Sequence, residues 1–105
     1  MTFKEYAAKY GAFFTSVCNK TAINPAALLT LSYQQIENKP QLLKVNNLFA
    51  VQNAGKLKTY KTPFEAIENA IQVITANPEF TRQKIGTLRA NPKLQFKKIR
   101  AILAN

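Results

Sequence analysis

The sequence predicts a small, mainly α-helical domain with one short β-hairpin or irregular loop. A length of 105 residues fits one ordinary domain, which we place over residues 1–105. An apolar fraction of 47% argues against disorder and provides for one packed core. Repeated Asn-Pro and Thr-Pro pairs mark helix starts along most of the chain. These three observations together favour a helical fold.

Pro at the first helical position lacks only an N–H that would be unpaired there, and a preceding Asn or Thr caps the next free ones. The four pairs of this kind are Asn24-Pro25, Thr62-Pro63, Asn77-Pro78 and Asn91-Pro92. Thr2 with Glu5, and Thr62 with Glu65, also match a capping box. We predict helices over 3–19, 25–36, 63–76, 78–89 and 92–103, with a short helical turn around 40–44.

Apolar spacing predicts which helix faces are buried. The third helix is expected to bury Phe64, Ile67, Ile71 and Ile74, and the fifth is expected to bury Phe96, Ile99 and Leu103. Between the second and third helices, two apolar-containing stretches, 48–52 and 56–61, flank Gly55, which permits a tight turn. We interpret this segment as a hairpin. Cys18 has no disulfide partner and is expected to be a small buried residue.

The charge balance predicts an affinity for polyanions. Fifteen Lys and Arg against five acidic residues give a formal charge of +10. Lys93, Lys97 and Arg100 fall at i, i+4 and i+7 of the last helix, as a cationic stripe. That stripe is either a solvated face or an attachment site for wall polymer, membrane headgroups or nucleic acid. No nucleic-acid motif accompanies it, so nucleic acid ranks behind the others.

The residues that are missing exclude several chemistries. Without His or Asp, and with one Cys, the chain cannot form a Ser-His-Asp or Cys-His catalytic site or a His/Cys site for zinc or haem. We therefore expect no metal and no cofactor. The carboxylates are Glu5, Glu37, Glu65, Glu68 and Glu79. All of these except Glu37 lie in the first turns of predicted helices, where a negative charge opposes the positive helix end.

Three motifs carry a family resemblance, in order along the chain. They are Ile23-Asn24-Pro25-Ala26-Ala27-Leu28-Leu29, Val45-Asn46-Asn47-Leu48-Phe49-Ala50-Val51, and Lys58-Thr59-Tyr60-Lys61-Thr62-Pro63-Phe64-Glu65-Ala66-Ile67. With them, segment 23–80 resembles the core of bacterial and phage N-acetylglucosaminidases of the autolysin and flagellar-hydrolase type, in the lysozyme-like superfamily. The family counterparts are the entry into the catalytic helix, an Asn-Asn-Leu-Phe-Gly-Ile stretch, and a Tyr-x-Ser-x-x-Glu-Ser step into the next helix. The resemblance implies a lysozyme-like fold.

The resemblance also implies a general acid, a Glu near the end of the catalytic helix that protonates the departing sugar oxygen. Counted from Pro25 without a gap, that position is Gln35, whose amide cannot donate the proton usefully. Glu37 is the alternative acid, or it is an ordinary solvated residue that pairs by spacing with Tyr33. Two residues along a helix span about 200° of rotation, so Gln35 and Glu37 cannot face one cleft while the helix stays regular.

The family's Trp-Gly after its Glu is absent here, as is its C-terminal segment with an aromatic residue, so we expect a reduced cleft. At the positions that the resemblance would place along the groove, the expected sugar-binding residues are Asn46, Asn47, Gln52 and Tyr60. Tyr60 could equally be a packed, half-buried strand residue.

The resemblance implies a domain directed at peptidoglycan glycan strands, a glucosaminidase or lytic transglycosylase that is active through Glu37 or catalytically impaired. A non-catalytic peptidoglycan-binding or structural virion module is the first alternative, and a basic nucleic-acid-binding helical protein is the second. Neither a signal peptide nor a transmembrane segment is visible. The small size and reduced cleft suit a phage-encoded protein, carried in a virion or released into the envelope at lysis.

Overall fold

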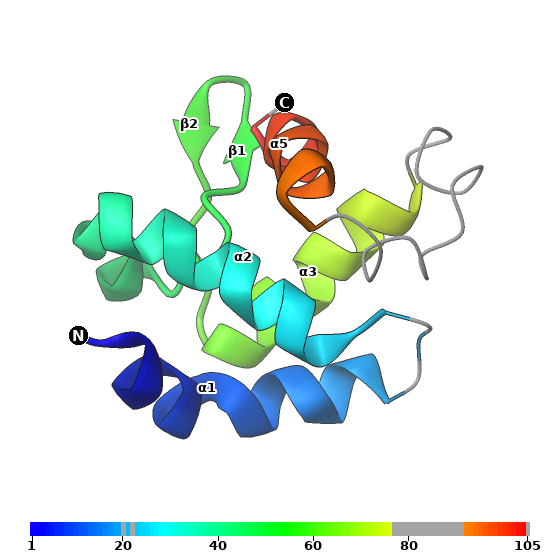
Figure 1. Cartoon of the computed structure of the whole chain (residues 1–105). Coiled ribbons are helices and arrows are strands. Elements are labelled where there is room, and N and C mark those ends of the chain that lie inside the picture. The colour runs from blue at the N-terminus through cyan, green and yellow to red at the C-terminus, as the bar shows by residue number, and fades with distance from the viewer. Residues whose placement is uncertain (20, 22, 77–91, 105) are drawn as a thin grey trace.

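The computed structural model describes residues 1–19, 21, 23–76 and 92–104. Its elements are α1 (Phe3–Cys18), α2 (Pro25–Asn38), the 3-10 helix η1 (Pro40–Val45), β1 (Gln52–Asn53), β2 (Lys56–Leu57), α3 (Pro63–Ala76) and α5 (Pro92–Leu103). In Figure 1, α1 runs along one side of the molecule and the small hairpin projects on the opposite side. The predicted class, mainly helix with one short hairpin, is confirmed. The predicted helix over 78–89 falls outside the described residues.

Local capping fixes the helix starts. At α1, the Thr2 hydroxyl accepts from the Glu5 backbone N–H at 3.2 Å, and the Glu5 carboxylate accepts from the Thr2 N–H at 3.2 Å. At α2, the Asn24 side-chain oxygen accepts from the N–H groups of Ala26 and Ala27. These contacts satisfy backbone donors that a helix leaves free at its first turn. Both predicted caps are therefore confirmed.

The start of α3 differs slightly from the predicted capping box. The Thr62 hydroxyl accepts from the Glu65 N–H at 3.2 Å, as expected. The Glu65 carboxylate, however, accepts from the N–H of Lys61, one residue earlier than the box requires, at 3.3 Å. Glu65 is thus a helix-start residue that also ties the preceding loop to α3.

The helices close around one cluster of buried side chains, to which α1 contributes Tyr6, Tyr10, Phe14 and Cys18. Ile99 and Leu103 are buried as predicted. Phe64 is not, since it is 37% exposed. The buried face of α3 is rotated toward Ala66 and Ala70, which are fully buried, because small residues allow a close approach of neighbouring helices. The Phe96 side chain lies outside the described part of the chain.

A buried chain of hydroxyl groups links α1, α2 and the following loop. The Tyr6 hydroxyl hydrogen-bonds to the Ser32 hydroxyl, and Ser32 in turn donates to the Leu48 carbonyl at 2.6 Å. Tyr6 and Ser32 are both fully buried. Burial raises the pKa of Tyr6, so its hydroxyl stays protonated as a donor. This chain fixes the Leu48 backbone against the two helices.

The hairpin is shorter than the sequence suggests. It pairs Gln52 with Leu57 and Asn53 with Lys56, so the strands have two residues each. Ala54 and Gly55 form the turn with positive φ angles of 54° and 79°. Positive φ at both central residues is what a two-residue hairpin turn of type I′ requires. Beyond Leu57 the chain is held by two isolated backbone hydrogen bonds, from the Lys58 N–H to the Val51 carbonyl at 3.0 Å and from the Tyr60 N–H to the Val45 carbonyl at 2.9 Å, together with the side chains described below.

No helix in the described residues is long and apolar enough to cross a membrane.

Candidate functional site

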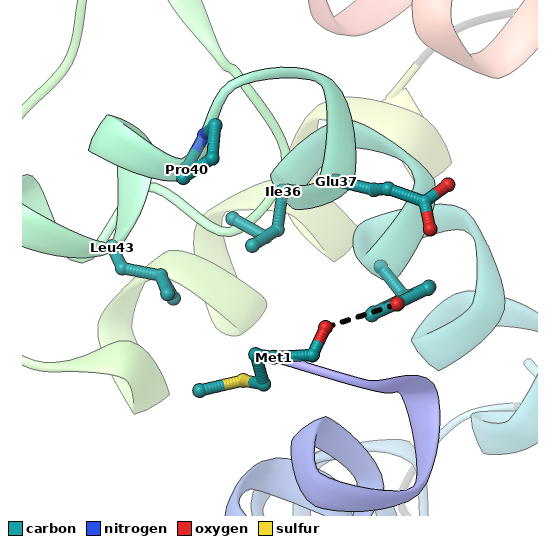
Figure 2. Close-up of a pocket in the computed structure, with 6 residues that line it drawn as sticks. Met1, Ile36, Glu37, Pro40 and Leu43 are labelled. Atoms are coloured by element: carbon teal, nitrogen blue, oxygen red, sulfur yellow. Dashed lines mark hydrogen bonds between the residues drawn. The ribbon is translucent and has the colours of Figure 1, made fainter.

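A pocket of about 320 Å³ lies at the C-terminal end of α2. It is lined by Met1, Tyr33, Ile36, Glu37, Pro40 and Leu43. These residues come from three places in the chain: the N-terminal segment, the last turns of α2, and η1. Figure 2 shows Leu43 and Pro40 of η1 across the pocket from the Glu37 carboxylate. The cavity thus lies at the end of α2, the helix near whose end the sequence analysis expects the acid.

Glu37 is the one carboxylate among the residues that line the pocket. It is exposed, and it lies in the last turn of a helix that stays hydrogen-bonded to its end, where the Lys39 N–H donates to the Gln35 carbonyl at 3.0 Å. Because the helix remains regular, the Gln35 side chain points about 200° around the helix axis from that of Glu37. Gln35 is half-buried and does not line the pocket.

Tyr33 lies one helical turn before Glu37 and closes the side of the pocket next to the N-terminal segment. Its hydroxyl donates to the Met1 carbonyl at 3.1 Å (Figure 2), and its ring meets Phe3 edge to face with centroids 5.3 Å apart. Desolvation, followed by the nearby negative charge of Glu37, raises the pKa of Tyr33. The hydroxyl therefore remains a donor at neutral pH.

Asn46 and Asn47, expected to bind sugar, instead use their amides to hold the chain. The Asn46 side chain donates to the carbonyls of Tyr60 and Lys61, each at 3.1 Å. Asn47 is fully buried; it donates to the carbonyls of Val51 and Lys58 and accepts from the Val51 N–H. Both N–H donors of each amide are occupied, which leaves them none to offer a ligand. The geometry makes both residues loop anchors.

Tyr60 and Gln52 lie apart from the pocket. Tyr60 is half-buried, and its hydroxyl donates to the Asn69 side-chain oxygen of α3 at 2.5 Å, while Lys58 Nζ approaches the same oxygen at 3.4 Å. Gln52 is half-buried in β1. Neither Asn46, Asn47, Gln52 nor Tyr60 lines the cavity that contains Glu37. The structure therefore does not bring the expected acid and the expected sugar-binding residues together at this pocket.

The predicted cationic stripe is only partly a free surface. Lys97 is exposed, whereas Arg100 is half-buried and its Nη1 donates to Gln34 Oε1 of α2 at 3.1 Å. Arg100 thus helps to fix α5 on α2. The Lys93 side chain lies outside the described part of the chain.

Five pocket residues were not singled out as site residues, namely Met1, Tyr33, Ile36, Pro40 and Leu43. Only Tyr33 had a signal, its four-residue spacing from Glu37. Among the described residues, no group of three or more Cys, Asp or Glu side chains is placed to hold a metal ion. Comparison of the chain with protein-family models, with curated proteins and with solved structures gives no match.

Proposed function

We propose that this chain is a peptidoglycan-directed, glycosidase-like domain that retains binding of the wall polymer and is impaired in catalysis. One observation carries the proposal: the only carboxylate lining the pocket at the end of α2 is Glu37, while the position of the family's acid holds the amide of Gln35.

Two features support an impaired acid rather than an efficient one. A general acid must carry its proton near neutral pH, and burial is the usual means by which a protein keeps a carboxyl group protonated. Glu37 is exposed and lacks that burial. The pocket also offers no second carboxylate to stabilise a developing positive charge on the sugar. Binding should therefore be easier to detect than turnover.

The test compares the unaltered protein with Glu37→Gln on purified sacculi. Glu68→Gln is the matched control, because Glu68 is an exposed residue of α3 away from the pocket. We expect the protein to sediment with sacculi, and any release of soluble sugar to be slow and to disappear in Glu37→Gln but not in Glu68→Gln. Failure to sediment would refute the proposal. Equal release by all three proteins would remove Glu37 as the acid.

A second candidate function, binding of nucleic acid, is favoured by the net charge of +10 and the exposed Lys97. Such binding would weaken steeply with added salt, because each neutralised phosphate releases counterions. Charge reversal at Lys97 would weaken it further, with the exposed Lys4 of α1 as the matched position. Equal effects of Lys97→Glu and Lys4→Glu would leave only a non-specific charge effect.

A further inference from the structure

Three oxygen groups at the pocket at the end of α2, from Glu37, Tyr33 and the Met1 backbone, have free capacity for accepting hydrogen bonds. The Glu37 carboxylate only accepts when ionised. The Tyr33 hydroxyl gives its single proton to the Met1 carbonyl, so the lone pairs of Tyr33 Oη and the second lone pair of that carbonyl remain available. Figure 2 shows the Met1 carbonyl and the Glu37 carboxylate on the same side of the pocket.

The rest of the pocket is aliphatic. Ile36, Leu43 and Pro40 supply hydrocarbon walls, and in Figure 2 the last two lie opposite the oxygen atoms. A volume of about 320 Å³ accommodates a short unbranched chain of methylene groups. The pocket thus has an apolar part and an oxygen-lined edge, the arrangement that suits a ligand with a hydrocarbon stem and a cationic end.

We propose that this pocket binds a primary ammonium group carried on an unbranched aliphatic stem, namely the side chain of the diamino acid in peptidoglycan stem peptides. An ammonium offers three donors and no acceptor, which matches the three oxygen groups of Glu37, Tyr33 and Met1. The stem would lie against Ile36 and Leu43. The choice of the wall peptide as the source rests on the proposed function, whereas the ammonium chemistry rests on the pocket alone.

The surrounding charges predict weak, selective binding. The chain as a whole is strongly positive, and Lys39 just before η1 and Lys44 within it are both exposed, so an approaching cation meets repulsion that salt screens. We expect an affinity in the millimolar range.

The experiment is a chemical-shift titration of the isotope-labelled protein, with retention of Met1 verified by intact mass. The probe is Nα-acetyl-lysine amide, and its Nε-acetylated form is the neutral control. We expect saturable shifts at Tyr33, Ile36 and Leu43. Glu37→Gln should weaken binding about two- to fivefold, the effect of an exposed ion pair, while Glu68→Gln should not change it.

The outcomes separate the ammonium site from its source. Absence of saturable shifts, or equal binding of the Nε-acetylated probe, would overturn the ammonium site. If the probe binds, soluble stem peptides with a free and with an acylated diamino-acid side chain test the source, and preference for the free amine supports it. Equal binding of both peptides would overturn the source. Sedimentation with sacculi without probe binding would reject this site and keep the proposed function. Probe binding without sedimentation would keep the ammonium site and reject the proposed function.

Discussion

The loop from Asn46 to Lys61 and the pocket at the end of α2 use polar groups in opposite ways. In the loop, the amides of Asn46 and Asn47 are bonded to backbone groups of the same chain. At the pocket, Glu37 is exposed and oxygen lone pairs remain unused. The polar side chains of the loop therefore contribute mainly to stability, and the oxygen atoms that remain free to meet a ligand lie at the pocket.

A substitution at Asn47 is the strongest test of this contrast between the loop and the pocket. We expect Asn47→Ala to lower the free energy of unfolding by about 2 to 4 kcal/mol, because it leaves the Val51 N–H and the Lys58 carbonyl without their side-chain partners. Urea unfolding measures the effect. Asn53→Ala, at an exposed strand position, is the control and should change little. A loss below about 1 kcal/mol for Asn47→Ala would contradict the anchoring role.

The buried hydroxyl chain should have the next largest effect. Ser32→Ala deprives both the Tyr6 hydroxyl and the Leu48 carbonyl of a partner, and should cost about 1 to 3 kcal/mol. Adding Tyr6→Phe should recover part of that loss, because it removes the orphaned hydroxyl. Thermal or urea unfolding of the two single variants and the double variant forms the cycle. Strictly additive losses would mean that the two hydroxyl groups act independently.

Ala50 offers a stabilising change in the same loop. Its φ of 55° is in the left-handed region, where an L-residue costs roughly 1 to 2 kcal/mol. Glycine removes that strain but gains freedom in the unfolded chain, so Ala50→Gly should raise stability by about 0.5 to 1 kcal/mol. Ala8→Gly, on the exposed face of α1, should instead destabilise by about 1 kcal/mol. Destabilisation at both positions would contradict the strain argument.

A substitution at the pocket should barely change the stability of the fold. Glu37→Gln removes an exposed charge, and we expect the free energy of unfolding to change by less than about 0.5 kcal/mol. The same variant should impair ligand binding, as described above. A loss of stability comparable to that of Asn47→Ala would mean that Glu37 also anchors the fold, and the contrast between the two regions would disappear.

The smallest expected effect is the contribution of Glu5 to the pH dependence of stability. Hydrogen bonds from the Thr2 backbone N–H and hydroxyl lower the pKa of Glu5 in the folded chain. The unfolded chain therefore binds a proton more readily, so the stabilisation from Glu5 is present above its ordinary pKa and is lost as pH falls through the lowered value. Glu5→Gln should flatten this part of the curve of urea midpoint against pH. An unchanged curve would rule out the carboxylate as its source.

The helix starts could be predicted because capping is local: Thr2, Asn24 and Thr62 act on residues within three positions. The end of α2 was placed two residues early, since Glu37 and Asn38 carry no stop signal of their own and only Pro40 breaks the pattern. The predicted burial of Phe64 was wrong because periodicity locates a stripe but not its edge, which here is set by Ala66 and Ala70 packing closely.

The candidate site was predictable in part. Spacing correctly separated Gln35 from Glu37, because both lie on one regular helix. It could not reveal whether the Asn47 amide faces a ligand or the backbone, since that depends on contacts with Lys58, eleven residues away. The pocket itself required three segments distant in the sequence to meet, and no local pattern contains that information.

Cys18 is a built-in probe for opening of the fold around α1. It is the only cysteine in the chain, it is 3% exposed, and desolvation raises its pKa, which suppresses the reactive thiolate. A thiol reagent should therefore modify the protein only when α1 separates from the core. The rate of modification would time that opening directly, without any introduced label.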